Sequence, residues 1–437
     1  MSANIRPDSA PTTRPRARVR YNPEYFGFIV GFPDGEIVLV KPTAMSVLHP
    51  QVTREELAPY LLTDLEVPDG FHLSTPPLVW LELTRRCDLA CPHCYIDGGR
   101  ARPHEMSTER WRALLDEMAG MGVWAVAFTG GEPTMHPDFA ELVRYARGLD
   151  LLVGVATHGL FLTDELLDSL PRDGVIISVS VDDLHKGRGG RESSAKRAME
   201  SILRARSKGF LTNVMTNTHR ENIDGLSELM RWAESNGVSV RSVPFSPMGR
   251  AKMRRDLENS PDDVERAAEF WLRECEWEHQ YHREAGLCVG VIFNYGLSLG
   301  YMTRRCSSGR FLCYVAADGA VFPCTMCVSE KVFAAGSVRE RPFADVWREH
   351  WEIRDYSWAN FASTCEGCVI NDPKYYCASR CPAMSHARNG TYFGCGASEF
   401  EILSTIHRTS LLEQTEVGKT TNLPVVPSHL GATRTQT

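Results

Sequence analysis

The chain lacks a long hydrophobic run. Across its 437 residues, no stretch approaches the roughly 18 consecutive apolar residues that suggest a membrane-spanning helix. Residues 1–20 carry charged residues and prolines in place of the apolar core of a secretory signal peptide. The sequence therefore predicts no membrane association and a cytoplasmic location.

A strongly basic charge balance is also absent. The net charge is −7, and the isoelectric point lies near 6.1. Nucleic-acid binding usually needs a basic surface that neutralises phosphates. The one short basic run, Lys252-Met253-Arg254-Arg255, is interpreted as a solvated face. No nucleic-acid partner is expected.

Cysteine, in contrast, is plentiful and unevenly spread. The sequence holds 14 cysteines, most of them in two dense groups. In a secreted chain this number would suggest disulfides, whereas grouped cysteines without a signal peptide favour metal ligation. A reducing compartment also suits oxygen-sensitive metal clusters.

Strand and helix patterns alternate between Pro77 and about Pro247. Alternating βα units predict a parallel sheet whose faces are covered by helices. The expected strands are Leu78–Leu83, Ala125–Phe128, Leu151–Ala156, Val175–Val181, Thr212–Thr216 and Val238–Val243. The expected helices are Trp111–Met121, Phe139–Gly148, Asp164–Leu170, Ser194–Lys208 and Ile223–Ser235. Upstream, Phe26–Val30 and Ile37–Val40 flank Pro33-Asp34-Gly35 and predict a hairpin, which a helix over about Thr53–Leu62 follows.

The first cysteine group lies directly after the first expected strand of this region. Cys87, Cys91 and Cys94 form a C-x3-C-x2-C motif. Iron-sulfur clusters are held by cysteine thiolates, so three ligands for a cluster that needs four leave one iron open to a substrate or cofactor. A zinc site or three unrelated buried thiols is the alternative.

This spacing resembles that of the radical SAM superfamily. The resemblance implies that S-adenosylmethionine binds the open iron through its amino and carboxylate groups. One-electron reduction then gives methionine and a 5′-deoxyadenosyl radical. It also implies an α/β fold, the partial (β/α)6 TIM-like barrel, and the six expected strands with helical returns match this fold. Active-site loops in such barrels lie at the C-terminal strand ends.

Motifs at later strand ends resemble the cofactor-binding elements of that superfamily. Gly130-Gly131-Glu132 would contact the methionine amino group, since glycines permit close approach and a carboxylate accepts from an ammonium group. Ser180 and Asp182 would contact the ribose or carboxylate, although a helix cap needs the same residues. Gly249 would contact the cofactor through its backbone, with a plain turn as the alternative.

Three further residues near the expected strand ends are titratable or charged. Arg188 and Arg191 follow in a Gly-rich loop, and one of them, assigned as Arg188, would reach the cofactor carboxylate. His158 stands where relatives usually have asparagine in Thr-Asn-Gly. Histidine can act as acid, base or ligand, but we expect it to fill the turn position and donate one hydrogen bond.

The second cysteine group resembles the SPASM domain, with a longer loop between Cys368 and Cys377 than the family pattern has. The resemblance implies two auxiliary [4Fe-4S] clusters. One would be held by Cys306, Cys313, Cys324 and Cys381, and the other by Cys365, Cys368, Cys377 and Cys395. A pair of zinc sites is the alternative. Cys327 has no place in this scheme and is a spare thiol, an alternative ligand or a hydrogen donor to a substrate radical.

Together the resemblances imply a radical SAM/SPASM enzyme that abstracts hydrogen from a ribosomally synthesised peptide to crosslink or oxidise it. A flavodoxin- or ferredoxin-type protein would supply the electron. A dehydrogenase or bond-forming enzyme for a small metabolite is the alternative from the same chemistry. A non-enzymatic electron carrier would need neither the open iron nor Gly130-Gly131-Glu132.

The expected organisation has two disordered tails around four structured parts. These are a tail at 1–18, a small N-terminal domain at 19–75 that binds a leader peptide or forms a structural hairpin, a radical SAM barrel at 76–250, a helical linker at 251–300, a SPASM domain at 301–415 and a tail at 416–437.

Overall fold

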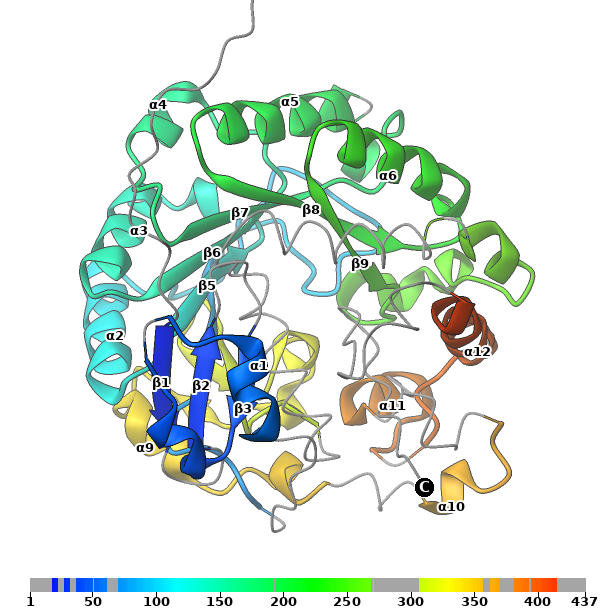
Figure 1. Cartoon of the computed structure of the whole chain (residues 1–437). Helices are drawn as coiled ribbons and strands as arrows, with labels where there is room; N and C mark the ends of the chain where they lie inside the picture. Colours follow the sequence, from blue (N-terminus) through cyan, green and yellow to red (C-terminus); the bar gives the residue numbers. More distant parts are fainter. Residues whose placement is uncertain are drawn as a thin grey trace, which may run out of the picture.

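A nine-stranded, largely parallel sheet forms the centre of the computed structural model (Figure 1). Its strand order is β12-β11-β10-β4-β5-β6-β7-β8-β9. The structure describes residues 18–22, 27–31, 37–49, 51–60, 70–191, 193–268, 270, 306–356, 362–369, 381–392 and 394–414.

Six strands of this sheet are parallel and consecutive in the chain, and they form the barrel. They are β4 (Leu78–Thr84), β5 (Ala125–Gly130), β6 (Leu152–Thr157), β7 (Val175–Ser180), β8 (Leu211–Thr218) and β9 (Ser239–Pro244). Each coincides with a predicted strand to within two residues at either end. The expected (β/α)6 arrangement is therefore confirmed.

Helices cover the outside of these strands (Figure 1). They are α2 (Thr108–Met121), α3 (Phe139–Gly148), α4 (Asp164–Asp168), α5 (Ser193–Ser207) and α6 (Leu226–Ser235). Helix α2 illustrates why they form: the Ser107 side chain caps its N-terminus, and Gly122 ends it in a left-handed conformation. Its buried face has helical spacing and comprises Trp111, Leu114, Leu115 and Met118.

A separate three-stranded antiparallel sheet with the order β1-β2-β3 lies near the N-terminus. Strands β2 (Gly27–Gly31) and β3 (Ile37–Val40) form the predicted hairpin. Strand β1 (Arg18–Asn22) is not among the predicted strands, although its sequence Arg-Val-Arg-Tyr-Asn alternates polar and apolar residues as a half-buried strand does. Helix α1 (Arg54–Leu57) continues as a 3-10 turn to Tyr60, within the predicted helical stretch.

The C-terminal part extends the barrel sheet at its β4 edge. Strand β10 (Leu312–Val315) pairs parallel with β4, while β11 (Ala320–Phe322) and β12 (Gly336–Ser337) continue antiparallel. The helices that follow are α9 (Phe343–Arg348), α10 (Ala362–Cys365), α11 (Pro382–Asn389) and α12 (Glu399–Gln414). The sheet thus places β10, which carries Cys313 of the second cysteine group, beside the strand that precedes the first group.

Among the described residues, no helix is both long enough and apolar enough to cross a membrane. Most of the predicted linker at 251–300 lies outside the described residues, as do Cys377 and nearly all of the two predicted tails.

Candidate active site

The loop with Cys87, Cys91 and Cys94 leaves the C-terminal end of β4 and folds back on itself. The Cys94 amide donates to the Cys91 carbonyl at 3.2 Å. Two thiol sulfurs accept backbone hydrogen bonds, from Leu89 to Cys87 and from Gly98 to Cys94, each at 3.4 Å. Such N–H···S bonds are among the features that tune protein-bound iron-sulfur clusters. The loop therefore supplies suitable donors for a cluster.

Two of these thiols lie in surroundings that disfavour their thiolate forms. Burial, followed by the carboxylates of Glu132 and Asp88 among its causes, raises the pKa of Cys87 to about 12. Burial also raises the pKa of Cys91. A coordinated metal ion deprotonates a thiol outright. Burial thus makes the Cys87 and Cys91 thiols less acidic, and a metal centre bound here would supply the positive charge that stabilises their thiolate forms.

The motif Gly130-Gly131-Glu132 packs against the start of this loop. The Gly131 amide donates to the Thr84 carbonyl at 2.8 Å, and the Glu132 amide donates to the Arg86 carbonyl at 2.7 Å. A Cβ atom on Gly131 would lie 2.3 Å from the Arg86 carbonyl oxygen. Glycine is required here because the two backbones touch. The motif thereby fixes the chain immediately before Cys87.

The Glu132 carboxylate joins the ends of β5 and β6. It is 1% exposed. It accepts hydrogen bonds from the Thr157 hydroxyl at 2.6 Å and from the His158 amide at 2.8 Å. The Thr134 amide and hydroxyl also donate to it, at 3.1 and 2.5 Å. Glu132 therefore links the ends of β5 and β6 through these hydrogen bonds.

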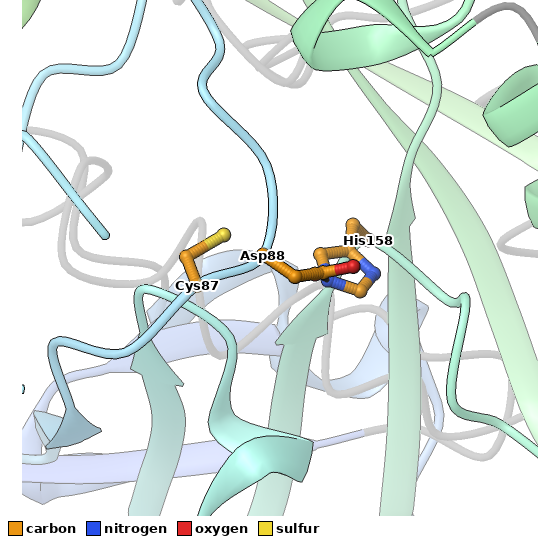
Figure 2. A group of neighbouring side chains, drawn as sticks. All are labelled: Cys87, Asp88 and His158. Carbon is orange, nitrogen blue, oxygen red and sulfur yellow. Dashed lines mark hydrogen bonds and ion pairs between the residues drawn. The ribbon is translucent and has the colours of Figure 1, made fainter. Parts of the chain in front are cut away.

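His158 connects the end of β6 to the cysteine loop (Figure 2). Its Nε2 lies 2.9 Å from Asp88 Oδ1, next to Cys87, while the Leu160 amide donates to its Nδ1 at 3.1 Å. The other carboxylate oxygen of Asp88, Oδ2, forms an ion pair with Arg191 Nη1 at 2.6 Å. His158 fills the turn position as expected, and its ring additionally positions the cysteine loop.

A second buried polar cluster lies at the end of β7. Asp182 pairs with Arg188 Nε at 2.6 Å and His93 Nε2 at 3.2 Å, and accepts from the Asn217 amide at 2.9 Å. Although burial opposes ionisation, Arg188 and His93 lower the pKa of Asp182. Burial lowers the pKa of His93 to about 3. A carboxylate and a guanidinium are thus held together beside the cysteine loop.

A small pocket opens at this point. Ser180, Asp182 and Arg188 line it together with Leu89 of the cysteine loop and His158. Three of the predicted cofactor-binding residues thus meet at one cavity beside the predicted cluster loop.

Two histidines at this site escaped the sequence reasoning. His93 lies inside the C-x3-C-x2-C motif, and its ring stacks on that of His219 with centroids 5.2 Å apart. His93, His219 and Asp182 place one ligand atom each within 4.8 Å of one another. The position of His93 inside the cysteine motif could have indicated that it belongs to the site. Nothing in the sequence around His219, which follows β8, indicates this.

Gly249 is also close to the cysteine loop. A Cβ atom there would lie 2.3 Å from the Tyr95 carbonyl oxygen, and the backbone has a positive φ of 55°. The next residue, Arg250, donates from Nη1 to the Cys91 carbonyl at 3.1 Å and from its amide to the Cys94 carbonyl at 3.0 Å. The predicted turn therefore braces the loop from the β9 side.

The second cysteine group is only partly brought together within the described residues. Cys365 and Cys368 lie on one turn at the end of α10, and Cys395 is exposed. Cys306, Cys324 and Cys381 influence one another: beside burial, neighbouring thiols raise the pKa values of Cys306 and Cys381. Cys313 lies in the middle of β10.

The fold and the cysteine loop define the class of enzyme. The model of the radical SAM superfamily matches residues 81–233, and that of SPASM, an iron-sulfur cluster-binding domain, matches residues 306–369. The resemblance to the radical SAM superfamily and to the SPASM domain that the sequence indicated is confirmed. The enzyme uses S-adenosylmethionine and iron-sulfur clusters.

Relatives with named activities match over most of their length. The AdoMet-dependent heme synthase of Methanosarcina barkeri is 30% identical and covers 73% of this chain and 95% of its own. The PqqA peptide cyclase of Xanthomonas euvesicatoria pv. vesicatoria is 30% identical, covering 72% and 85%. Mycofactocin maturase MftC of Mycolicibacterium smegmatis is 29% identical, covering 68% and 76%. The chain belongs to the radical SAM superfamily and carries a SPASM domain.

The fold is also that of solved structures. SuiB of Streptococcus suis bound to precursor peptide SuiA has a TM-score of 0.52 at 17% identity, covering 64% of this chain and 66% of that chain. This likeness establishes the fold.

Proposed function

We propose that the chain modifies a ribosomally synthesised peptide by hydrogen abstraction, forming a crosslink or an oxidised residue. The observation that carries the reaction type is the loop of Cys87, Cys91 and Cys94, braced by Gly131 and Gly249 beside a polar pocket. The peptide substrate is favoured by relatives named PqqA peptide cyclase and mycofactocin maturase.

Each part of the site has a role in this proposal. Cys87, Cys91 and Cys94 hold one cluster, which with bound S-adenosylmethionine supplies the 5′-deoxyadenosyl radical. Glu132 and the two glycines before it receive the methionine end of the cofactor. Ser180, Asp182, Arg188 and Gly249 surround the rest of the cofactor.

The charges on the two sides of the cysteine loop support this orientation. S-adenosylmethionine carries an ammonium and a carboxylate on its methionine end. Glu132 offers a carboxylate on the β5 side, and Arg188 offers a guanidinium on the β7 side. Opposite charges on the two sides match the two ends of the amino acid group.

We assign the remaining parts as follows. Residues 76–250 form the barrel, 251–300 a linker and 301–415 the SPASM domain, between tails at 1–18 and 416–437. The chain works in the cytoplasm, where a flavodoxin- or ferredoxin-type protein delivers the electron. The cysteines of the SPASM domain would hold auxiliary clusters, which would supply an electron acceptor for the substrate radical or a binding site for the substrate.

The N-terminal domain at 19–75 recognises a leader segment of the peptide. Its sheet has the order β1-β2-β3, and among the described residues no strand pairs with the outer edge of β3. An extended peptide binds such an edge by adding a strand. A substrate peptide with its N-terminal half removed would then be modified much more slowly than the full-length peptide.

The test is an anaerobic reaction of the reconstituted full chain with reductant, S-adenosylmethionine and a short Cys-, Gly- or aromatic-rich peptide encoded beside it. We expect a peptide that has lost hydrogen mass, formed together with 5′-deoxyadenosine. A triple alanine variant of Cys87, Cys91 and Cys94 is the control and forms neither product. An unchanged peptide alongside conversion of a tetrapyrrole or other small metabolite would replace this proposal with the second function below.

A second candidate is a dehydrogenase or bond-forming enzyme for a small metabolite. The observation that favours it is the 30% identity to an AdoMet-dependent heme synthase over 95% of that protein. The neighbouring genes discriminate: a short peptide gene favours the first function, and metabolite-pathway genes favour the second.

A further inference from the structure

Four buried or partly buried thiols converge at one end of the β10–β11 hairpin. Cys306 comes shortly before β10, and Cys324 comes directly after β11. Since the two strands are antiparallel neighbours, these positions fall at the same end of the pair. The Gly309 amide donates to the Pro323 carbonyl at 3.0 Å, which ties the two segments together.

Cys327 belongs to this end of the hairpin. Cys324 caps the single 3-10 turn Thr325–Cys327, and the Cys327 amide donates to the Cys324 carbonyl at 3.1 Å. This turn brings the Sγ atoms of the two residues to 3.6 Å from each other. Cys327 is fully buried. A side chain with no path to solvent therefore points at an adjacent thiol.

Cys381 approaches the same point from the C-terminal side. It caps α11, which packs against the 3-10 turn of Cys327. Four thiols from three segments thus meet at this end of the hairpin.

Cys313 lies in a different environment. On β10, the next residue Tyr314 donates its hydroxyl to Glu82 Oε2 at 2.7 Å inside the barrel. Successive strand residues point to opposite faces, so Cys313 faces away from the barrel interior. Its neighbour in the register with β4 is Val79, a residue of the buried apolar core.

We propose that Cys327, rather than Cys313, completes the ligand set of one auxiliary cluster together with Cys306, Cys324 and Cys381. Cys324 and Cys327 have C-x2-C spacing, which recurs among iron-sulfur cluster ligands and is also the spacing of Cys91 and Cys94. The assignment depends on the cluster-binding domain and not on the nature of the substrate. Cys313 then serves as a packed residue of the hairpin.

The test counts metal in the full-length chain. In a parent variant with Cys87, Cys91 and Cys94 replaced by alanine, two auxiliary clusters correspond to about eight irons and eight sulfides per chain. Cys327→Ala in this parent is expected to lose about half of both, along with the electron paramagnetic resonance signal of one reduced cluster. The matched Cys313→Ala variant is expected to keep all of them.

Three results would overturn the assignment. These are an unchanged iron count in Cys327→Ala, a loss of one cluster in Cys313→Ala, or zinc in place of iron in the parent. A Cys327→Ser variant distinguishes loss of a ligand from misfolding, because serine keeps the size of the side chain. If Cys327 is a ligand, the serine oxygen would alter the electron paramagnetic resonance signal of the cluster without removing the site. No peptide is added, so failure of the proposed peptide reaction leaves this readout unaffected.

Discussion

Replacing Gly131 with alanine tests whether the Gly-Gly-Glu motif positions the cysteine loop. The new Cβ would lie 2.3 Å from the Arg86 carbonyl oxygen and 2.5 Å from that of Arg85, both backbone atoms. The loop would have to retreat by about 1 Å to restore ordinary contact. Overpacking of this kind typically costs about 1–3 kcal/mol. Weakening the Gly131 and Glu132 amide hydrogen bonds adds about 1 kcal/mol each.

The chemical consequence should exceed the effect on stability. Cys87 directly follows Arg86, and a displacement of about 1 Å at a reacting centre can reduce a rate about 100-fold. We therefore expect Gly131→Ala to form 5′-deoxyadenosine about 100-fold more slowly per reconstituted chain. The assay is an anaerobic time course with excess reductant, normalised to bound iron.

Gly99 provides a matched control on the same loop. A Cβ atom there would meet no heavy atom within 4 Å, and its backbone does not have positive φ. Gly99→Ala should retain the rate within a few-fold. Equal rates for the Gly131→Ala and Gly99→Ala variants would refute the reasoning.

Three further predictions concern buried charges. Asp182→Asn leaves the partly buried Arg188 without its carboxylate, which should lower the free energy of unfolding in guanidinium by about 2–3 kcal/mol; a change within error would contradict the pairing. Burial lowers the pKa of His136, so the unfolded chain binds more protons just below pH 6.5 and stability should fall as pH drops through that value. His136→Gln should flatten this slope in pH-dependent unfolding, and an unaltered slope would count against it. Arg354→Gln leaves buried carbonyls without donors and should cost about 2–5 kcal/mol in thermal unfolding, whereas exposed Arg348→Gln should be neutral; equal melting temperatures would argue against this role.

The barrel could be predicted because its signals are local. Strand β7 is a run of apolar and small residues that is buried from Val175 to Val179, and α3 has a regular buried stripe. The sequence patterns of buried parallel strands and amphipathic helices can be recognised within about ten residues. The cysteine motif was equally local, since its ligands lie within one loop.

What could not be predicted depends on contacts between distant residues. Strand β10 pairs with β4 across more than 200 positions of sequence, and short strands carry no signal for such a partner. The contact between His158 and Asp88 likewise joins residues 70 positions apart. The side of β10 that Cys313 faces follows from the strand register, which spacing alone does not determine.

The central claim is tested most directly by anaerobic purification and reconstitution of the full chain. Iron, sulfide and 5′-deoxyadenosine released with reductant are measured together. The account predicts about twelve irons per chain, corresponding to three [4Fe-4S] clusters, with cleavage of S-adenosylmethionine that disappears when Cys87, Cys91 and Cys94 become alanine. Bound zinc without cleavage, or cleavage that survives loss of these three cysteines, would contradict it.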